Sequence, residues 1–208
     1  MDRNIYISVA HIDHFIHDLK EFEDDYTRKF SDKRRKKESL LARHLLNSLC
    51  LKTKSLDLFR LGFSKDEFGC PFFANLRSLH CSITHCNGWV IVALSNQLIG
   101  IDLEMICAEQ KDDLRIAFND NEWATIKDDS LDVFKNFSFK ESYSKYLGKG
   151  FNIEPKDISV NENIFNLSHV FSLGFSENKY IFTLVAELEV IDESIDWGEF
   201  NLDERVFK

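Results

Sequence analysis

Alternating and continuous apolar runs predict strands in both halves of the chain. Ile5 to Val9 alternates between apolar and polar positions, and Trp89 to Leu94 is a continuous apolar run typical of a buried strand. In Ile99 to Glu104, Ile101 and Leu103 share one face and two acidic residues share the other. Further strands are predicted over residues 58–63, 158–160, 171–175 and 180–189.

Helical spacing predicts two long helices and some shorter helical segments between the strands. Ser31 or Asp32 caps a helix that runs to about Leu51, with an apolar stripe at Leu41, Ala42, Leu45, Leu46 and Leu49. The second long helix covers residues 131–147, and Gly148 and Gly150 end it. Residues 11–30 and 114–127 also read as helical, with a turn and cap at 118–122. This mixture of helices and strands is compatible with an α/β fold.

Length and composition narrow the class of protein. The 208 residues allow one large domain or two small ones, and a hydrophobic content of 44% with 19 phenylalanines indicates a globular core. A net charge of −9 speaks against nucleic-acid binding. Five cysteines without a CxxC spacing favour a reducing compartment, and no signal peptide or membrane span is expected. We therefore expect a cytoplasmic protein.

One segment departs from the acidic composition. Residues 28–37 hold seven basic residues against the single acid Asp32. This basic segment is either a solvated helix start or a dock for phosphates or an acidic partner, and the sequence leaves both open.

Three acidic residues and a lysine form the candidate chemistry. Asp102 and Glu104 at spacing two on a strand form a forked oxygen site, and Glu141 would add a third carboxylate. Hard oxygen ligands of this kind suit Mg²⁺, which keeps places for water and phosphate. Lys145 lies four residues after Glu141, on the same helix face, where it would hold a phosphate oxygen. Taken alone, Glu141 and Lys145 also fit a surface ion pair.

Two histidine-rich stretches suggest metals less strongly. His11, His14 and His17 lie at spacing three, but a polar helix face explains them better. A zinc site from His80, Cys81, His85 and Cys86 conflicts with strand geometry, because the four side chains would split between two faces.

The chain resembles a known family at two motifs. Gly-Ile-Asp-Leu-Glu at 100–104, followed by Phe-Ser-Phe-Lys-Glu-Ser-(x)3-Lys-(x)2-Gly-Lys-Gly-Phe from Phe137, is similar to the paired signature of the Sfp-type 4′-phosphopantetheinyl transferases. The resemblance runs from about Arg28 to Val185. It implies two similar α/β halves, residues 1–106 and 107–208, related by a pseudo-twofold axis, with the site between them.

The resemblance also implies a reaction and its partners. Such an enzyme, of the holo-[acyl-carrier-protein] synthase type, moves the 4′-phosphopantetheine arm of coenzyme A to a serine of an apo acyl, peptidyl or aryl carrier protein. It releases adenosine 3′,5′-bisphosphate. Carriers of fatty-acid, polyketide, nonribosomal-peptide and lysine pathways all remain open. A monomer that binds neither nucleic acid nor membrane is expected.

The implied site residues follow the motifs. Mg²⁺, or Mn²⁺ in its place, would lie on Asp102, Glu104 and Glu141; Glu141 would take the serine proton, directly or through a water, and Lys145 would stabilise the phosphate. Coenzyme A would contact Ser39, Phe68, Thr84, His85, Lys140 and Lys145. Asn166 to His169 imitates the family's histidine motif, but it follows both metal motifs, whereas the family's histidine precedes them.

Departures from the family pattern keep rival functions open. Cys70 stands where the family has a lysine beside the adenine, and Thr84 replaces a serine. These changes favour a second hypothesis, a non-catalytic coenzyme A or carrier-domain binding protein. A third is a Mg²⁺-dependent phosphohydrolase built on the same carboxylates.

Overall fold

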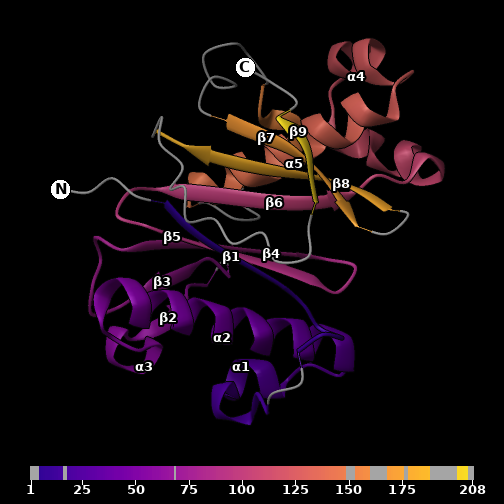
Figure 1. The fold of residues 1–208 in the computed structure, drawn as a ribbon. Helices are drawn as coiled ribbons and strands as arrows, with labels where there is room; N and C mark the ends of the chain where they lie inside the picture. Colours follow the sequence, from indigo (N-terminus) through magenta and orange to yellow (C-terminus); the bar gives the residue numbers. More distant parts are fainter. Residues whose placement is uncertain are drawn as a thin grey trace.

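The structure, a computed structural model, describes residues 5–15, 18–67, 69–148, 153–159, 168–175, 178–187 and 201–205 (Figure 1). Within these ranges no helix is long and apolar enough to cross a membrane. The elements in chain order are β1 (Ile5–His11), η1 (Lys20–Phe22), α1 (Asp25–Arg28), α2 (Lys33–Lys54), α3 (Leu58–Leu61), β2 (Phe63–Lys65), β3 (Pro71–Phe73), β4 (His80–Cys86), β5 (Trp89–Ser95), β6 (Ile99–Met105), η2 (Ala108–Ala117), α4 (Asp120–Ile126), α5 (Ser130–Tyr146), η4 (Pro155–Asp157), β7 (Ser168–Phe175), β8 (Asn178–Ala186) and β9 (Asn201–Arg205).

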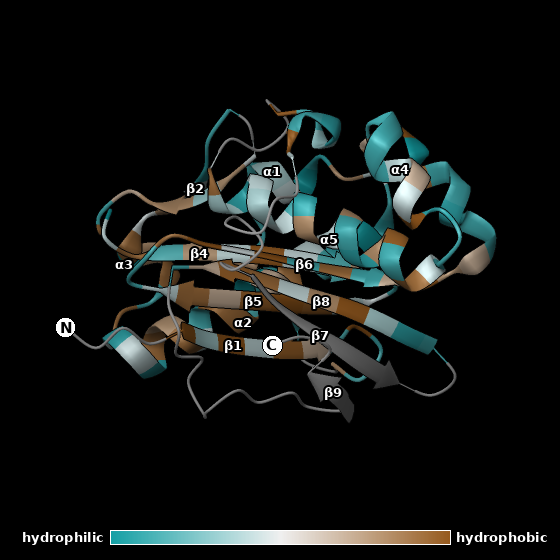
Figure 2. Ribbon diagram, turned by 90° about the horizontal axis from the view of Figure 1, so that it is seen from above, coloured by the Kyte–Doolittle hydropathy of each residue, from teal (hydrophilic) through white to brown (hydrophobic). Residues whose placement is uncertain are grey.

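Two antiparallel sheets form the centre of the fold. The first has the strand order β1-β5-β4 and the second β6-β8-β7-β9, while β2 and β3 form a separate hairpin. The inner faces of the two large sheets share one core, in which Ile7 and Ile91 of the first sheet cluster with Ile101 and Phe182 of the second. Figure 2 shows brown, hydrophobic segments along β1, β5 and β8.

Each sheet is covered on its outer face by one long helix. The stripe predicted for α2, including Leu41, Leu45 and Leu49, is buried against Val90 and Val92 of β5. On the other side, Phe139 and Tyr146 of α5 pack against Val185 of β8. The α/β class predicted from the sequence is confirmed, and the same helix-on-sheet arrangement occurs at both large sheets.

The strand pairing bears on the predicted division into halves. β6, which the sequence grouped with residues 1–106, pairs along its whole length with β8, from Ile99 opposite Ala186 to Met105 opposite Tyr180. The strand that carries Asp102 and Glu104 therefore belongs to the same sheet that α5 covers.

Three local expectations differ from the structure. Residues 58–63 begin as the short helix α3, because the Asp57 side chain caps it by accepting from the Arg60 N–H. In place of one helix over residues 11–30, the described part of this segment has η1 and α1, and His11 ends β1. Ile158 lies at the end of η4. The cap predicted at 118–122 is confirmed: Asn119 and Glu122 form a capping box that begins α4.

Candidate active site

Side-chain hydroxyls join the two sheets where β4 and β6 run side by side. Ser82 accepts a hydrogen bond from the Ile101 N–H at 3.0 Å, and Thr84 accepts one from the Leu103 N–H at 3.1 Å. The two hydroxyls therefore take the place of backbone carbonyls. Both side chains are buried, so this junction holds the acidic strand in place.

Asp102 of β6 meets Lys145 of α5 at this junction. The Lys145 ammonium donates to Asp102 Oδ1 at 2.8 Å and to the Ile101 carbonyl at 3.0 Å, and the Thr84 hydroxyl approaches the same carboxylate oxygen at 3.3 Å. Asp102 is buried, and its Oδ2 has no hydrogen-bond partner among the described residues. A buried carboxylate oxygen without a partner is costly, so this atom is a ready position for a ligand.

Glu104 and Glu141 add negative charge next to Asp102. Burial, then the charge of Asp102, raises the pKa of Glu104 to about 8, against the opposing effect of Lys145. Burial and Asp102 also raise the pKa of Glu141. Carboxylates gathered in this way carry negative charge that a divalent cation would neutralise.

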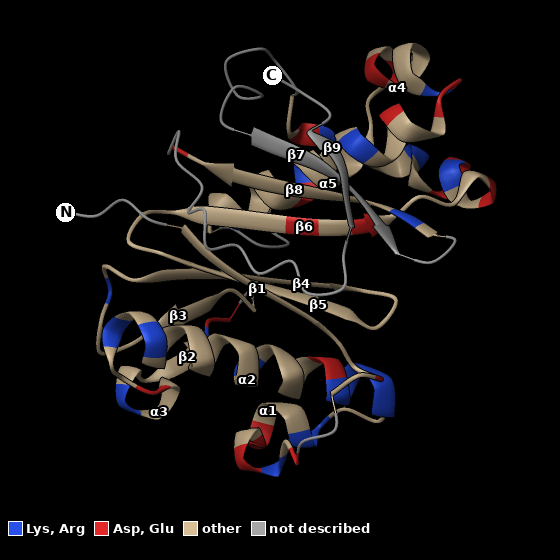
Figure 3. Ribbon diagram, viewed as in Figure 1, with Lys and Arg blue, Asp and Glu red and all other residues tan. Residues whose placement is uncertain are grey.

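The carboxylates suit Mg²⁺ in donor type and in charge, but their oxygens do not point to one common position. Among the described residues, no three Asp, Glu, His or Cys side chains form a group arranged to hold a metal ion. Lys145 takes part of the neutralising role at Asp102 Oδ1. Figure 3 shows the acidic segments of β6 in red and the basic N-terminal end of α2 in blue.

A cavity of about 780 Å³ opens beside this cluster. Its wall is formed by α2, the β2–β3 hairpin, β4, the C-terminal part of α5 and residues 153–155. Five Lys or Arg side chains line it, Arg35, Arg43, Lys65, Arg77 and Lys145, together with the acids Glu141 and Glu154. The excess of cations favours an anionic ligand.

Aromatic rings alternate with the cations around the cavity. The Arg77 guanidinium lies 4.5 Å from the Phe72 ring centre, and the Lys65 ammonium lies 4.5 Å from that of Tyr26. Arg43 lies between the rings of Tyr26 and Phe63 and donates to Asp24 Oδ2 at 2.8 Å. Flat apolar faces beside fixed cations suit a ligand with both an aromatic base and phosphates.

The cavity brings together four of the predicted site residues. Ser39, His85, Glu141 and Lys145 all line its wall. Thr84 does not: its hydroxyl is used at the junction of β4 and β6. Phe68, predicted to stack on the adenine, lies outside the described residues. Asp102 reaches the cavity through its contact with Lys145.

Lys140, predicted to add a second positive charge, is fully buried elsewhere. Its ammonium pairs with Glu122 at 2.7 Å and donates to the carbonyls of Ala117 and Pro155. An ammonium has three hydrogens, and these three oxygens account for them. Its position therefore ties η2, α4 and η4 to α5 and leaves no hydrogen for a coenzyme phosphate.

Lys65 is a cation that the sequence reasoning missed. Position 70, a lysine in the family pattern, is a cysteine that lines the cavity. Lys65 lies directly across the hairpin, opposite Pro71, and lines the same wall. The strand predicted over residues 58–63 ends before Lys65. The sequence therefore does not predict the hairpin that brings this lysine close to position 70.

Within the basic segment, different residues have different partners. Arg35 lines the cavity and lies over the Phe30 ring at 5.3 Å. Lys36 pairs with Glu23 at 2.7 Å, and Arg34 contacts Glu38 and Asn87. Part of the basic segment therefore lines the cavity, and part of it is paired with neighbouring side chains at the start of α2.

Comparisons with known proteins show which family this sequence is similar to. The sequence model of the 4′-phosphopantetheinyl transferase superfamily matches residues 98–185, which include β6, α5 and β8. Both motifs that carry the predicted resemblance to the Sfp type lie within this matched region, and that resemblance is confirmed.

Individual relatives agree with the family match. The chain is 32% identical over 138 residues to 4′-phosphopantetheinyl transferase Sfp of Bacillus subtilis (strain 168), which covers 64% of this chain and 62% of the relative. It is 32% identical over 133 residues to the transferase gsp of Aneurinibacillus migulanus, covering 60% and 54%. It is 32% identical over 123 residues to L-aminoadipate-semialdehyde dehydrogenase-phosphopantetheinyl transferase of Candida glabrata, covering 53% and 46%. The chain thus spans between about half and three fifths of these relatives.

Proposed function

We propose that this protein transfers the 4′-phosphopantetheine arm of coenzyme A to a serine hydroxyl of an apo carrier protein. The serine oxygen forms a bond to the β-phosphorus, the phosphoanhydride bond breaks, and adenosine 3′,5′-bisphosphate leaves with the electron pair. The serine proton passes to a base. The relatives' names support this class of reaction. The single observation that carries it here is the contact of Lys145 with Asp102 at the edge of a cationic, aromatic-lined cavity.

The positively charged residues of the cavity would bind phosphate, and the acidic residue Glu141 would accept the proton. Lys145 faces the cavity and neutralises charge on the phosphate under attack. Glu141 also lines the cavity, where it would take the serine proton directly or through a water. Arg35, Lys65 and His85 also line the wall, where they would hold the remaining phosphates.

We propose that Asp102, Glu104 and Glu141 hold Mg²⁺, which would neutralise charge on the pyrophosphate. Asp102 Oδ2, which has no hydrogen-bond partner among the described residues, and the negative charges of Asp102 and Glu141 beside Glu104 support this assignment.

Incubation with coenzyme A, Mg²⁺ and a panel of apo carrier proteins tests the proposal. We expect at least one carrier to gain the mass of one phosphopantetheine arm, measured by intact-protein mass spectrometry. The panel should include fatty-acid, polyketide, nonribosomal-peptide and lysine-pathway carriers. Coenzyme A binding without any modified carrier would instead support the binding-protein hypothesis, and coenzyme A cleavage without a carrier would support the phosphohydrolase.

The basic segment should contribute mainly to carrier association. Changing Lys33, Arg34, Lys36 and Lys37 together to Ala should raise the KM for an acidic carrier, more at low salt than at high, because exposed charges are screened over about 8 Å at physiological ionic strength. The loss for coenzyme A should be smaller, since Arg35, which lines the cavity, is kept. Steady-state kinetics at two salt concentrations measure this. Unchanged kinetics for both substrates at low salt would show the segment to be only a solvated helix start.

A further inference from the structure

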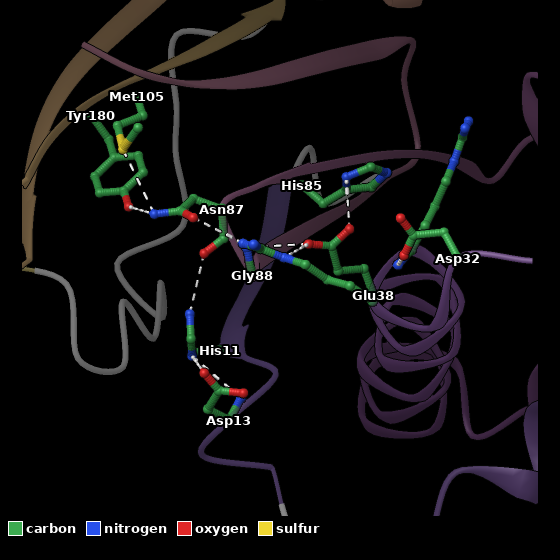
Figure 4. Close-up of polar contacts among 11 residues, drawn as sticks. His11, Asp13, Asp32, Glu38, His85, Asn87, Gly88, Met105 and Tyr180 are labelled. Atoms are coloured by element: carbon green, nitrogen blue, oxygen red, sulfur yellow. Dashed lines mark hydrogen bonds and ion pairs between the residues drawn. The ribbon is translucent and has the colours of Figure 1, made fainter. Parts of the chain in front are cut away.

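Glu38 of α2 is a buried carboxylate surrounded by donors (Figure 4). Its Oε1 accepts from the Gly88 N–H at 3.1 Å and from Arg34 Nε at 3.3 Å, and its Oε2 lies 3.4 Å from His85 Nδ1. The Glu38 side chain is 8% exposed, whereas that of His85 is 43% exposed and lines the cavity. A buried carboxylate is retained only when it is well paired, so these contacts fix its position.

The turn that Glu38 contacts is itself rigid. Asn87 and Gly88 have φ of 50° and 87°, the left-handed pair that a two-residue hairpin turn needs. Arg34 donates to Asn87 Oδ1 at 2.9 Å, and the Asn87 amide donates to the Tyr180 hydroxyl at 3.3 Å. A Cβ on Gly88 would lie 2.6 Å from the His11 ring, so the turn needs glycine at this position. Glu38 is therefore held from α2 and from the turn that follows His85.

This arrangement determines which His85 nitrogen faces a ligand. Nδ1 is the ring nitrogen beside the Glu38 carboxylate, and an ionised carboxylate can only accept, so Nδ1 carries the hydrogen and Nε2 is left for the cavity. In the neutral ring Nε2 carries a lone pair, and a phosphate oxygen can only accept, so the two repel. His85 can bind a phosphate in this orientation only after Nε2 has gained a proton.

The charges around His85 keep the free ring neutral. Burial lowers the pKa of His85 from its ordinary value of 6.5, and Lys145 of α5, Arg35 of α2 and Lys65 of β2 lower it further, while Glu38 opposes them. A bound phosphate dianion would act in the opposite direction and favour the charged ring. The protonated form therefore belongs to the complex and the neutral form to the free protein.

We propose that Glu38 is a positioning residue that fixes the His85 ring through Nδ1, so that a phosphate group binding in the cavity is accompanied by proton uptake at Nε2. This rests on the proposed function only in taking coenzyme A as the ligand. Because the ring gains its proton on binding, affinity should fall as pH rises through the pKa of His85 in the complex.

Calorimetric titration of the full chain tests this proposal. Coenzyme A is titrated near neutral pH in two buffers that differ in ionisation enthalpy, so that the difference in heat reports proton uptake. We expect uptake by the wild type and none by Glu38→Gln, because the glutamine amide would donate to Nδ1 and leave Nε2 already carrying hydrogen. Glu38→Gln should also bind about tenfold more weakly at the acidic end of the pH range, where the charged hydrogen bond is lost.

Further variants separate positioning from folding. His85→Gln should abolish the uptake in the same way, and Glu21→Gln, an exposed carboxylate on η1, should leave it unchanged. Dephospho-coenzyme A identifies the phosphate: uptake with both ligands supports the proposal and assigns Nε2 to the pyrophosphate, and uptake with coenzyme A alone assigns it to the 3′-phosphate.

Two results would overturn the inference. One is a wild type that binds coenzyme A without taking up a proton, and the other is equal uptake by wild type and Glu38→Gln. Failure of the transferase proposal looks different, since no carrier would be modified while linked uptake on coenzyme A binding persisted. Normal carrier modification without linked uptake would sink only the present inference.

Discussion

Asp102→Asn is expected to reduce phosphopantetheine transfer about 10³-fold, the size of loss seen when one preorganised charge-stabilising group is removed from an active site. The amide removes the negative charge that Lys145 contacts and halves the oxygen ligands that Asp102 offers. Glu104→Ala should have a similar effect, because it removes a second carboxylate from the same cluster. Initial rates with coenzyme A, a competent carrier and varied Mg²⁺ measure both changes.

Fold and charge controls make this result interpretable. Asp112→Asn, an exposed acid on η2, carries the same chemical change and should leave the rate unchanged. Asp102→Asn keeps the size of the side chain, so thermal unfolding should show a far smaller effect than the rate does. If the two cluster variants transferred at the wild-type rate, Asp102 and Glu104 would not form the proposed metal site.

The elements that carry the candidate chemistry could be predicted because their patterns are long and regular. β6 has strict alternation, and α5 has a capping residue at Asp129 and a glycine after its end. The strand predicted over residues 58–63 is wrong, because a short apolar run does not distinguish a strand from one helical turn. There the cap at Asp57 and the left-handed Gly62 decide the outcome.

Contacts within the candidate site were harder to predict than its members. Spacing on one helix pairs Lys145 with Glu141, but the Lys145 ammonium reaches across to Asp102, 43 residues away in the sequence. Lys140 lies in the same motif, yet it turns toward Glu122 and is fully buried. Neighbouring positions on a helix point in different directions, so one motif supplies both a cavity residue and a structural one. Only the tertiary packing separates the two.

Gly100 fixes how closely the acidic strand approaches α5. A Cβ built at this position would lie 1.9 Å from the Ser142 carbonyl oxygen and 2.5 Å from the Tyr146 nitrogen, both backbone atoms of α5. Backbone atoms in the middle of a helix cannot move aside as a flexible side chain can. The glycine that opens the Gly-Ile-Asp-Leu-Glu motif is therefore needed for close packing, and the same approach brings Lys145 within reach of the Ile101 carbonyl at 3.0 Å.

Gly100→Ala should consequently lower the free energy of unfolding by about 3 kcal/mol or more, the upper range for overpacking a core. Because β6 must move away from α5, transfer should fall even in the fraction that remains folded. Chemical denaturation and initial rates measure the two effects separately. Gly69→Ala is the control, because nothing lies within 4 Å of the Cβ added there. The φ of 83° at Gly69 disfavours alanine, so about 1 kcal/mol of backbone strain is expected without any steric clash. Equal stability losses in the two variants would contradict the steric explanation, because only the Cβ at Gly100 meets the backbone of α5.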